Sequence, residues 1–509
     1  MKTIALKGAG LSLEQVEAVA LGDAKVRLAP ASLPRLRASR RVVERALELD
    51  APAYGINTGL GRLSDVRIPP GGIRDLQVNL VRSHACGVGA PLATAAVRAM
   101  LLLRANSLAK GYSGVRPKLV EALCALLNRR VHPVVPSQGS VGASGDLAPL
   151  AHLALVLIGE GEAELGGKRM PGAAALRQAG LRPLLLEAKE GLSLLNGTQA
   201  MLATGILSLL AAERLVESAE VVGAMSLEAL RGTPVAFDPR LQDVRGQQGQ
   251  KISAARLRAL IAGSQIRRSH LHCGRVQDAY SLRCMPQVHG AVRDTLTFVR
   301  ATFEAEANAA VDNPLVFTTP QGGEVLSGGN FHGEPLAFGL DYLAIVLTSL
   351  AGISERRIER LVNPALNEGL PAFLAPDPGL HSGLMMAQVT AAALVAENRV
   401  LAHPASVDSV PTSANKEDYV SMGMGAALKL QQVVANTANV LGIELIAATH
   451  ALGHLAPLRP GRRLQAALAR AQAEIAPLLA DRVQSGDMAR AQALVLNGAL
   501  NAAFGATRR

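Results

Sequence analysis

The sequence has very few aromatic residues. In 509 residues there is no tryptophan, and there are only five tyrosines and eight phenylalanines. The core must therefore be built mainly from alanine, leucine and valine. Alanine and leucine are the best helix formers, and small residues let helix axes approach closely, so this composition favours a protein of packed helices.

Cysteine is also scarce. The four cysteines show no C-x-x-C spacing, which argues against both a disulfide framework and a zinc module: Cys86, Cys124, Cys273 and Cys284. His270 and His272 precede Cys273, but the sequence offers no second cluster of ligands to complete a metal site. We expect no bound metal.

Charged residues make up only 18% of the chain, yet the net charge is +11. The basic residues are spread out, as in Leu33–Arg45, and the longest clusters are pairs such as Arg356-Arg357 and Arg462-Arg463. Nucleic-acid binders usually cluster their basic residues and interleave aromatics. We therefore interpret the charge as solvated helix faces and expect no nucleic-acid partner.

The first ten residues lack the long apolar segment of a signal peptide. Gly191–Ala212 carries no formal charge and is long enough to span a membrane. Polar residues interrupt its first half, however, and charged residues continue the pattern from Glu213. We predict a buried core helix here, and a cytoplasmic protein without a membrane segment.

No internal repeat and no linker divides the chain. We expect residues 1–110 to form a smaller mixed region with a strand at Thr3–Leu6, and residues 111–509 to form a helical bundle. Glu160–Gly172 is typical of a hairpin that turns at Gly166-Gly167. Four long helices are predicted: Thr198–Arg231, Gly333–Leu361, Gly383–His403 and Gly423–Leu452.

The most informative segment is Gly139-Ser-Val-Gly-Ala-Ser-Gly-Asp-Leu-Ala-Pro-Leu150. Its simplest interpretation is a turn before a helix that Ser144 or Asp146 caps. A hydrolase nucleophile elbow is excluded because Asp146 stands where G-x-S-x-G requires glycine. Phosphate and dinucleotide loops are excluded because the glycine pattern differs and no G-K-[ST] follows.

The whole stretch resembles the signature of the aromatic amino-acid ammonia-lyase and aminomutase family. The resemblance implies a mainly α fold, the long-helix bundle of the ammonia-lyase (fumarase/aspartase-like) type. It also implies that Ala143-Ser144-Gly145 cyclises into 4-methylidene-imidazole-5-one (MIO), with no external cofactor. The nitrogen of Gly145 would attack the carbonyl carbon of Ala143, and Ser144 would lose its hydroxyl. Glycine suits this role because a residue without Cβ permits close approach in a strained turn.

Two further segments are similar to the family's catalytic loops. Tyr54-Gly-Ile-Asn-Thr-Gly59 resembles the tyrosine loop, in which the tyrosine is the base. Because a free tyrosine has a pKa of about 10, its surroundings would have to lower that value. Asn196-Gly-Thr resembles the segment whose asparagine lies against the MIO group and the substrate amine.

Residues 276–283, Val-Gln-Asp-Ala-Tyr-Ser-Leu-Arg, resemble the family's V-Q-D-x-Y-x-L-R. The resemblance implies that Gln277 and Tyr280 flank the MIO group and that Arg283 binds the substrate carboxylate as a fork. Asn313 would help hold this carboxylate, and Phe331 would pack beside the MIO group.

Two positions favour the family's histidine branch. Ser83-His84 stands where phenylalanine enzymes tend to have Phe-Leu and tyrosine enzymes His-Leu, and Glu417 stands where both have glutamine. A carboxylate can accept a hydrogen bond from an imidazole N–H. Five positions depart from that branch, which usually reads VQDPYSLRCQPQVMG and NQEDHVSMG: Ala279, Met285, His289, Lys416 and Tyr419.

The resemblance therefore implies a carbon–nitrogen lyase that eliminates ammonia from L-histidine, a small-molecule substrate, to give trans-urocanate. A modified histidine, another aryl-alanine or an aminomutase outcome stays open, as does a nucleic-acid-binding protein on an inactive lyase fold. The family forms homotetramers in which three subunits contribute loops to each active site. We expect the same assembly here, since long apolar helices need partners to cover them.

Overall fold

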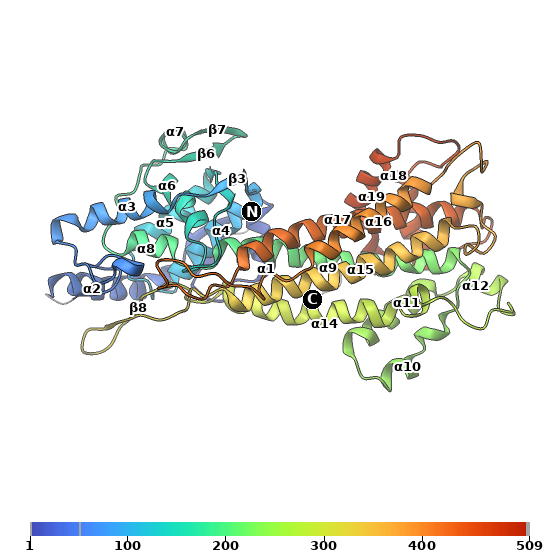
Figure 1. Cartoon of the computed structure of the whole chain (residues 1–509), viewed down its shortest axis with the longest axis horizontal. Coiled ribbons are helices and arrows are strands. Elements are labelled where there is room, and N and C mark those ends of the chain that lie inside the picture. Colours follow the sequence, from blue (N-terminus) through green and yellow to red (C-terminus); the bar gives the residue numbers. More distant parts are fainter. Residues whose placement is uncertain (1–2, 50–51, 505–509) are drawn as a thin grey trace. The chain divides into compact units, whose positions relative to one another are not determined.

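The computed structural model describes residues 3–49 and 52–504, and helices predominate in it (Figure 1). The chain divides into two compact units. The first unit comprises Met1–Leu207, Arg300–Asp341 and Pro404–Leu428; the second comprises Ser208–Val299, Tyr342–His403 and Lys429–Arg509. These units interleave along the chain, whereas we expected two consecutive regions that meet at residue 110. That boundary stays a prediction.

The first unit contains most of the short helices. They are α1 (Leu13–Ala20), η1 (Pro30–Ser32), α2 (Leu33–Glu48), η2 (Gly61–Leu63), η3 (Pro70–Gly72), α3 (Ile73–His84), α4 (Thr94–Ala109), α5 (Pro117–Asn128), α6 (Leu147–Leu157), α7 (Gly172–Gln178) and α8 (Glu190–Leu195). Local sequence explains where they begin. Ser12, for example, accepts a hydrogen bond from the backbone of Gln15, whose side chain accepts one from Ser12 N, so α1 begins with a complete capping box.

Four small sheets accompany these helices in the described part of the first unit. The strands are β1 (Thr3–Leu6), β2 (Lys25–Leu28), β3 (Val88–Pro91), β4 (His132–Pro133), β5 (Pro136–Gln138), β6 (Glu162–Leu165), β7 (Lys168–Pro171), β8 (Leu315–Phe317) and β9 (Glu324–Leu326). β1 and β2 are parallel, with Thr3 opposite Lys25, and the other pairs are antiparallel: β3–β5, β4–β6–β7 and β8–β9. The predicted strand Thr3–Leu6 and the predicted hairpin are confirmed. Gly166 and Gly167 form its turn with φ values of 59° and 77°, which glycine adopts without strain.

Among its described residues, the second unit contains helices joined by loops, and no named strand. Its own elements are η4 (Pro234–Phe237), α10 (Pro239–Asp243), α11 (Gln248–Ile261), α12 (Gln265–Ser269), α13 (Tyr280–Arg283), η5 (Ala372–Leu374), α16 (Met385–Leu401), α18 (Arg462–Glu474), α19 (Ser485–Leu496) and η6 (Ala499–Phe504). Four long helices contribute residues to both units: α9 (Gln199–Ala229), α14 (Met285–Ala307), α15 (Glu334–Val362) and α17 (Gly423–Gly453). The predicted mainly α fold is confirmed. The four predicted long helices are α9, α15, α16 and α17, with ends that differ from the prediction by no more than two residues, whereas α14 was not predicted.

The apolar segment Gly191–Ala212 is buried as predicted, but the prediction of one continuous helix is wrong. α8 ends at Leu195 and α9 begins at Gln199, with a break at residues 196–198. Gly197 has a φ of 155°, and a Cβ at this position would lie 2.6 Å from the side-chain oxygen of Gln199. The break is what turns Asn196 toward the loop that carries Ser144.

Two helices, α9 and α15, are long and apolar enough to cross a membrane. In their most apolar stretches, 78% and 61% of the residues are buried inside the protein. A mostly buried helix of this kind is also what the core of a helical protein requires.

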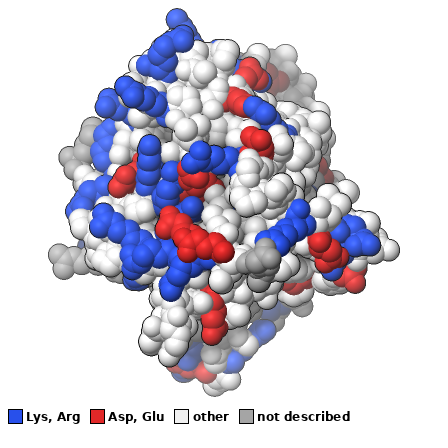
Figure 2. All heavy atoms as spheres, turned by 90° about the vertical axis from the view of Figure 1, so that its left-hand side faces the viewer, with Lys and Arg blue, Asp and Glu red and all other residues white. Residues whose placement is uncertain are grey.

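The basic residues are distributed among acidic ones. On the face that Figure 2 shows, Lys and Arg side chains outnumber Asp and Glu side chains, and acidic residues lie among the basic ones in its central part. In the first unit, for example, Arg74 pairs with Glu187 at 2.8 Å and Arg82 with Glu160 at 2.6 Å. The expectation of solvated helix faces agrees with this distribution, and the ion pairs add a feature that was not predicted.

Candidate active site

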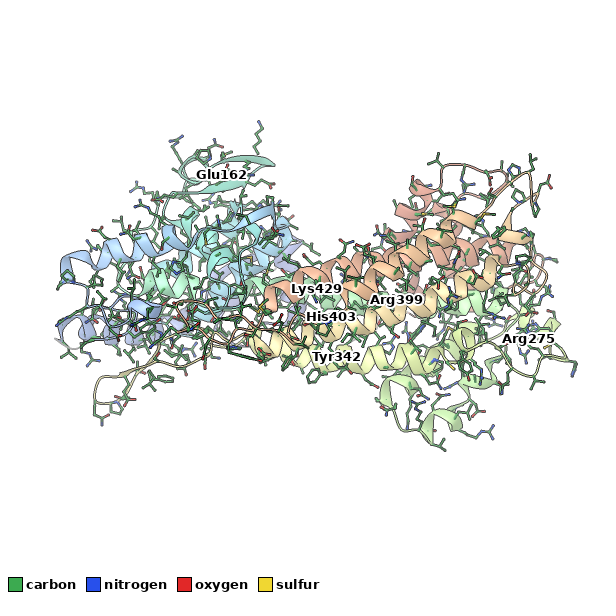
Figure 3. All side chains as sticks on the ribbon, in the orientation of Figure 1. Glu162, Arg275, Tyr342, Arg399, His403 and Lys429 are labelled. Atoms are coloured by element: carbon green, nitrogen blue, oxygen red, sulfur yellow. The ribbon has the colours of Figure 1, made fainter. Side chains whose placement is uncertain are left out.

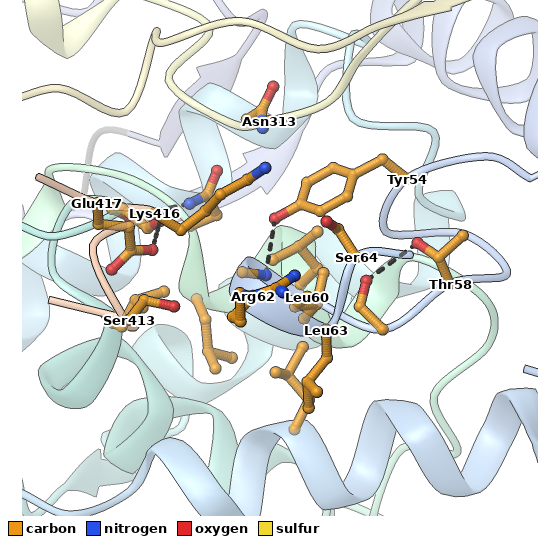
Figure 4. A pocket seen from close by; sticks show the side chains of 18 of the residues that line it. Tyr54, Thr58, Leu60, Arg62, Leu63, Ser64, Asn313, Ser413, Lys416 and Glu417 are labelled. Atoms are coloured by element: carbon orange, nitrogen blue, oxygen red, sulfur yellow. Dashed lines mark hydrogen bonds between the residues drawn. The ribbon is translucent and has the colours of Figure 1, made fainter. Parts of the chain in front are cut away.

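One cavity of about 1310 Å³ in the first unit collects most of the predicted site residues (Figure 4). Seven of the residues that line it were predicted from the sequence: Tyr54, His84, Ser144, Asn196, Asn313, Phe331 and Glu417. They come from six separate parts of the chain. An eighth lining residue, Lys416, was noted only as a departure from the family pattern.

The loop that carries Tyr54 rests on a hydrophobic cluster. Ile56 is fully buried in this cluster, which also contains Val42, Val43, Ile73, Ala188 and Val316. The Tyr54 hydroxyl accepts a long hydrogen bond of 3.5 Å from the backbone nitrogen of Gly61. Burial raises the pKa of Tyr54, the Gly61 hydrogen bond lowers it, and the negative charge of Glu417 raises it further. The net direction is upward, opposite to what a base requires.

The Ala143–Gly145 segment forms a tight turn. Gly145 donates a backbone hydrogen bond of 3.1 Å to Gly142 O, and the φ values of Gly142, Ser144 and Gly145 are 86°, 52° and 79°. For Ser144 this left-handed conformation costs about 1–2 kcal/mol. A Cβ at Gly145 would lie 2.6 Å from the carbonyl carbon of Gly197, so only glycine fits there.

Asp146 anchors this turn to a helix that is distant in sequence. Its carboxylate accepts hydrogen bonds from the backbone nitrogens of Ala200 and Met201, at 2.9 and 2.8 Å, and from Ser140 Oγ at 3.0 Å. Asp146 thus binds the first turn of α9 and does not cap its own helix, α6, through its side chain. Burial raises its pKa to about 6, although these three hydrogen bonds lower it.

Asn196 also contacts the Ala143–Gly145 turn. Its amide Nδ2 donates to Ser144 O at 2.9 Å. Its Oδ1 is buried and has no hydrogen-bond partner among the described residues. A buried acceptor without a partner is costly. Asn196 Oδ1 is therefore available to a donor such as a substrate ammonium group.

Glu417 contacts Ser144 directly. Glu417 Oε1 accepts from Ser144 Oγ at 2.9 Å, and Oε2 accepts from Thr412 Oγ1 at 2.9 Å. The loop before Glu417 is strained, because three successive residues other than glycine have left-handed φ values: 49° at Ser413, 53° at Ala414 and 61° at Asn415. Paired backbone hydrogen bonds between Thr412 and Glu417, of 2.8 and 3.3 Å, close this loop.

His84 lies at the end of α3 and lines the same cavity. Burial lowers its pKa, against the carbonyl of Leu80 and the charge of Glu417, which raise it. His84 Nδ1 lies 2.9 Å from Leu80 O. Because a carbonyl can only accept, Nδ1 carries the hydrogen of the neutral ring and Nε2 is left as an acceptor.

Asn313 is oriented by a backbone group. Its Oδ1 accepts from Gly328 N at 2.7 Å, which leaves the amide Nδ2 as a donor. Nδ2 has only a long contact of 3.3 Å with Ser327 Oγ. Asn313 can therefore donate to a carboxylate in the cavity, next to Phe331.

A buried charged cluster lies behind Asn313, and sequence reasoning missed it. Lys189 Nζ pairs with Asp312 Oδ2 at 2.7 Å, and both side chains are almost fully buried. Arg104 is fully buried too and donates to Ser193 O at 2.8 Å and to Gln199 Oε1 at 2.9 Å. Burial acts to raise the pKa of Asp312, but the charges of Lys189 and Arg104 hold it below its usual value. The available signal was Arg104, which directly follows the apolar run Ala99–Leu103.

Gln277, Tyr280 and Arg283 belong to the second unit and do not line this cavity. Their segment is anchored by Asp278, which accepts from Thr233 N at 2.6 Å and from Arg275, shown in Figure 3, at 3.1 Å. Gln277 is nevertheless exposed, and Tyr280 is 71% exposed.

Arg283 lies beside Tyr280, with its guanidinium carbon 4.5 Å from the centre of the ring. Its Nε is buried without a hydrogen-bond partner among the described residues. The roles predicted for Gln277, Tyr280 and Arg283 stay predictions.

One departure from the family pattern has a clear structural setting. His289 is fully buried in α14, and neither ring nitrogen has a hydrogen-bond partner in the described part of the chain. Burial lowers its pKa well below 6.5, and the charges of Arg357 and Arg293 act in the same direction. His289 is therefore a neutral core residue. Within the described residues, no group of three or more His, Cys, Asp or Glu side chains could hold a metal ion.

Comparisons with known proteins agree with this geometry. Residues 11–473 match the aromatic amino acid lyase family. The chain is 59% identical to a histidine ammonia-lyase of Koribacter versatilis (strain Ellin345), with 99% of each chain covered. It resembles the crystal structure of histidine ammonia-lyase from Trypanosoma cruzi with a TM-score of 0.91 at 41% identity, over 99% of this chain and 95% of that one. It also resembles tyrosine aminomutase from Streptomyces globisporus with a TM-score of 0.93 at 38% identity, over 99% and 98%. This chain belongs to the aromatic amino acid lyase family.

Proposed function

We propose that the protein eliminates ammonia from L-histidine to give trans-urocanate. The observation that carries the proposal is that Tyr54, His84, Ser144 and Glu417 line one cavity. This combination joins a tyrosine base, the serine of the Ala-Ser-Gly segment and two polar groups suited to an imidazole ring. The full-length similarity to proteins named histidine ammonia-lyase supports the same substrate.

The Ala143–Gly145 turn fits the formation of an MIO group. The left-handed turn, the close approach of Gly145 to Gly197 and the hydrogen bonds from Asn196 and to Glu417 constrain the turn on both sides. Such constraints hold strained conformations in place. When formed, the MIO group supplies an electrophile that makes the substrate amine a better leaving group.

The residues of this chain then account for the proton transfer. The Tyr54 phenolate takes a β-proton of the substrate, and the C–H electron pair forms the new double bond. The C–N bond breaks, and its electron pair leaves with the nitrogen. Asn196 Oδ1 accepts a hydrogen bond from the substrate amine and orients it.

The imidazole and the carboxylate of the substrate are held by different groups. Loss of the Ser144 hydroxyl leaves Glu417 Oε1 free, so Glu417 accepts the ring N–H, and His84 shapes the adjoining wall. Asn313 Nδ2 donates to the carboxylate, and Arg283 binds it through a planar fork. Because Gln277, Tyr280 and Arg283 are not among the residues that line the cavity, we propose that a homotetramer completes each site with residues from neighbouring subunits.

Incubation with L-histidine, L-phenylalanine and L-tyrosine side by side tests this function. Product absorbance and free ammonia are followed together. We expect equal amounts of urocanate and ammonia from L-histidine. Preference for either of the other amino acids over every imidazole tested would contradict the substrate while leaving the lyase chemistry in place.

An aminomutase is the second candidate, supported by the structural similarity to tyrosine aminomutase. It would return the amine to the β-carbon in place of releasing it. The same incubation distinguishes the two outcomes, because a mutase forms a β-amino acid with little free ammonia.

A further inference from the structure

We propose that the ammonium group of Lys416 stabilises the phenolate of Tyr54, and so prepares this tyrosine to remove the substrate proton. The inference rests on the proposed lyase function, in which Tyr54 is the base. Lys416 would be a positioning residue that acts through Tyr54 and need not touch the substrate.

The surroundings of Tyr54 leave its phenolate without adequate support. The side chain is half-buried, the Gly61 N–H contact is long at 3.5 Å, and the nearby charge of Glu417 is negative. Burial and the charge of Glu417 both favour the neutral phenol, and only the weak hydrogen bond from Gly61 favours the phenolate. A tyrosine that works as a base near neutral pH therefore needs a cation close by.

Among the residues that line the cavity, Lys416 is the cation that is available. The charged and titratable residues there are Tyr54, Arg62, Asp65, His84, Lys416 and Glu417. Arg62 lies 3.7 Å from Asp65 in an ion pair that is largely exposed to solvent. His84 is held neutral by burial. Behind the cavity, the charge of Asp312 is already paired with Lys189.

Lys416 is not engaged elsewhere in the described structure. Its backbone nitrogen donates to Ser413 O at 3.1 Å, and its ammonium group forms no ion pair within the described ranges. The neighbouring carboxylate of Glu417 accepts from Thr412 Oγ1 at 2.9 Å, a bond that does not depend on the Ser144 hydroxyl. Within the described ranges, Lys416 and Glu417 form no direct ion pair.

The strained loop explains how two adjacent residues both reach the cavity. Adjacent side chains on an extended strand point to opposite sides. Here the three left-handed residues 413–415 change the direction of the chain, and both Lys416 and Glu417 line the cavity. In Figure 4 the Lys416 side chain extends toward the side of the cavity on which Tyr54 and Asn313 lie. Backbone strain is often concentrated at functional sites, and this strained loop directly precedes two charged residues that line the cavity.

Titration of Tyr54 in the free enzyme tests the proposal directly. The chain has five tyrosines and no tryptophan, so the phenolate absorbance of one tyrosine is measurable. Subtracting a Tyr54→Phe variant isolates Tyr54 and cancels any absorbance that both proteins share. The same subtraction between Lys416→Gln and the double variant Lys416→Gln/Tyr54→Phe gives the midpoint of the Tyr54 titration in the absence of the lysine charge. We expect Lys416→Gln to raise this midpoint by about one pH unit, a tenfold change in ionisation.

Two matched variants and one kinetic readout complete the test. Lys416→Arg, which keeps the charge, should retain a midpoint near that of the wild type, and Arg62→Gln should leave it unchanged. In Lys416→Gln the rising limb of the plot of kcat against pH should shift to higher pH, by the same number of pH units as the midpoint of the Tyr54 titration. An unchanged midpoint combined with a raised KM would overturn the proposal and assign Lys416 to substrate binding. Because the titration needs no turnover, a shifted midpoint in a protein that releases no ammonia from histidine would refute the proposed function alone.

Discussion

The hydroxyl of Ser144 donates a hydrogen bond of 2.9 Å to Oε1 of Glu417, although the two residues are 273 positions apart in the chain. This contact connects the segment expected to form the electrophile with the carboxylate expected to bind the substrate ring. A ring bound to Glu417 is consequently held next to the Ala143–Gly145 turn.

Glu417→Gln should lower turnover of L-histidine far more than any residual turnover of L-phenylalanine. The reason is that a site built to bind a polar ring leaves its own polar groups unpaired when an apolar ring enters. In the wild type we expect L-histidine to be preferred over L-phenylalanine by at least about a thousandfold in kcat/KM. Steady-state kinetics with both substrates measure this. Equal losses for the two substrates would show that Glu417 does not select the ring.

Replacement of Arg283 should weaken transition-state binding by about 1.5–3 kcal/mol, or one to two decades in kcat/KM. Its Nε has no partner among the described residues, so a substrate carboxylate would supply one. Arg283→Lys should recover little of the loss, since a point charge cannot reproduce a planar fork. Near-wild-type kinetics for both Arg283→Ala and Arg283→Lys would remove this residue from the site.

Lys189→Met should destabilise the protein strongly. It leaves the buried carboxylate of Asp312 without its partner at 2.7 Å, and breaking a buried pair in this way costs about 3–5 kcal/mol. Urea unfolding measures the loss. In the double variant Lys189→Met/Asp312→Asn no unpaired anion remains, and it should be more stable than Lys189→Met alone. If the losses in free energy of unfolding of Lys189→Met and Asp312→Asn simply added up in the double variant, the two residues would not act as a pair.

His289→Met should make the protein less sensitive to acid. The folded pKa of His289 lies well below 6.5, the unfolded value, so below about pH 6.5 the unfolded chain binds a proton that the folded chain does not. The wild type then loses up to about 1.4 kcal/mol per pH unit from this residue, and a methionine removes that loss.

Thermal unfolding midpoints between pH 5 and pH 8 (roughly the range in which a histidine titrates) test this prediction. The difference in thermal unfolding midpoint between His289→Met and wild type should be constant above the pH at which an unfolded histidine titrates, and it should grow as the pH falls below that value. His272→Met, a change at an exposed histidine, serves as the control. A difference that is independent of pH would show that His289 does not couple folding to protons.

Sequence reasoning succeeded where the signal was local. The four long helices follow from runs of helix-forming residues, and the hairpin follows from Gly166-Gly167. The motifs around Tyr54, Ser144 and Glu417 identified residues that the fold brings into one cavity. In each case the information lies within a few neighbouring positions.

Distant contacts could not be predicted in this way. Asp146 looks like a cap for the helix that follows it, but it binds the backbone of Ala200 and Met201. The pair between Lys189 and Asp312 joins residues 123 positions apart. The break at Gly197 depends on its packing against Gln199 and the Gly145 turn. Helical periodicity carries no information about any of these contacts.

The intact mass of the purified protein tests the central claim most directly, because cyclisation of Ala143-Ser144-Gly145 releases two molecules of water. The account predicts a mass about 36 Da below that of the translated chain, and Ser144→Ala should show neither this full loss nor more than a trace of the lyase activity. A wild-type protein of full translated mass that still releases ammonia from L-histidine at an undiminished rate would contradict the account.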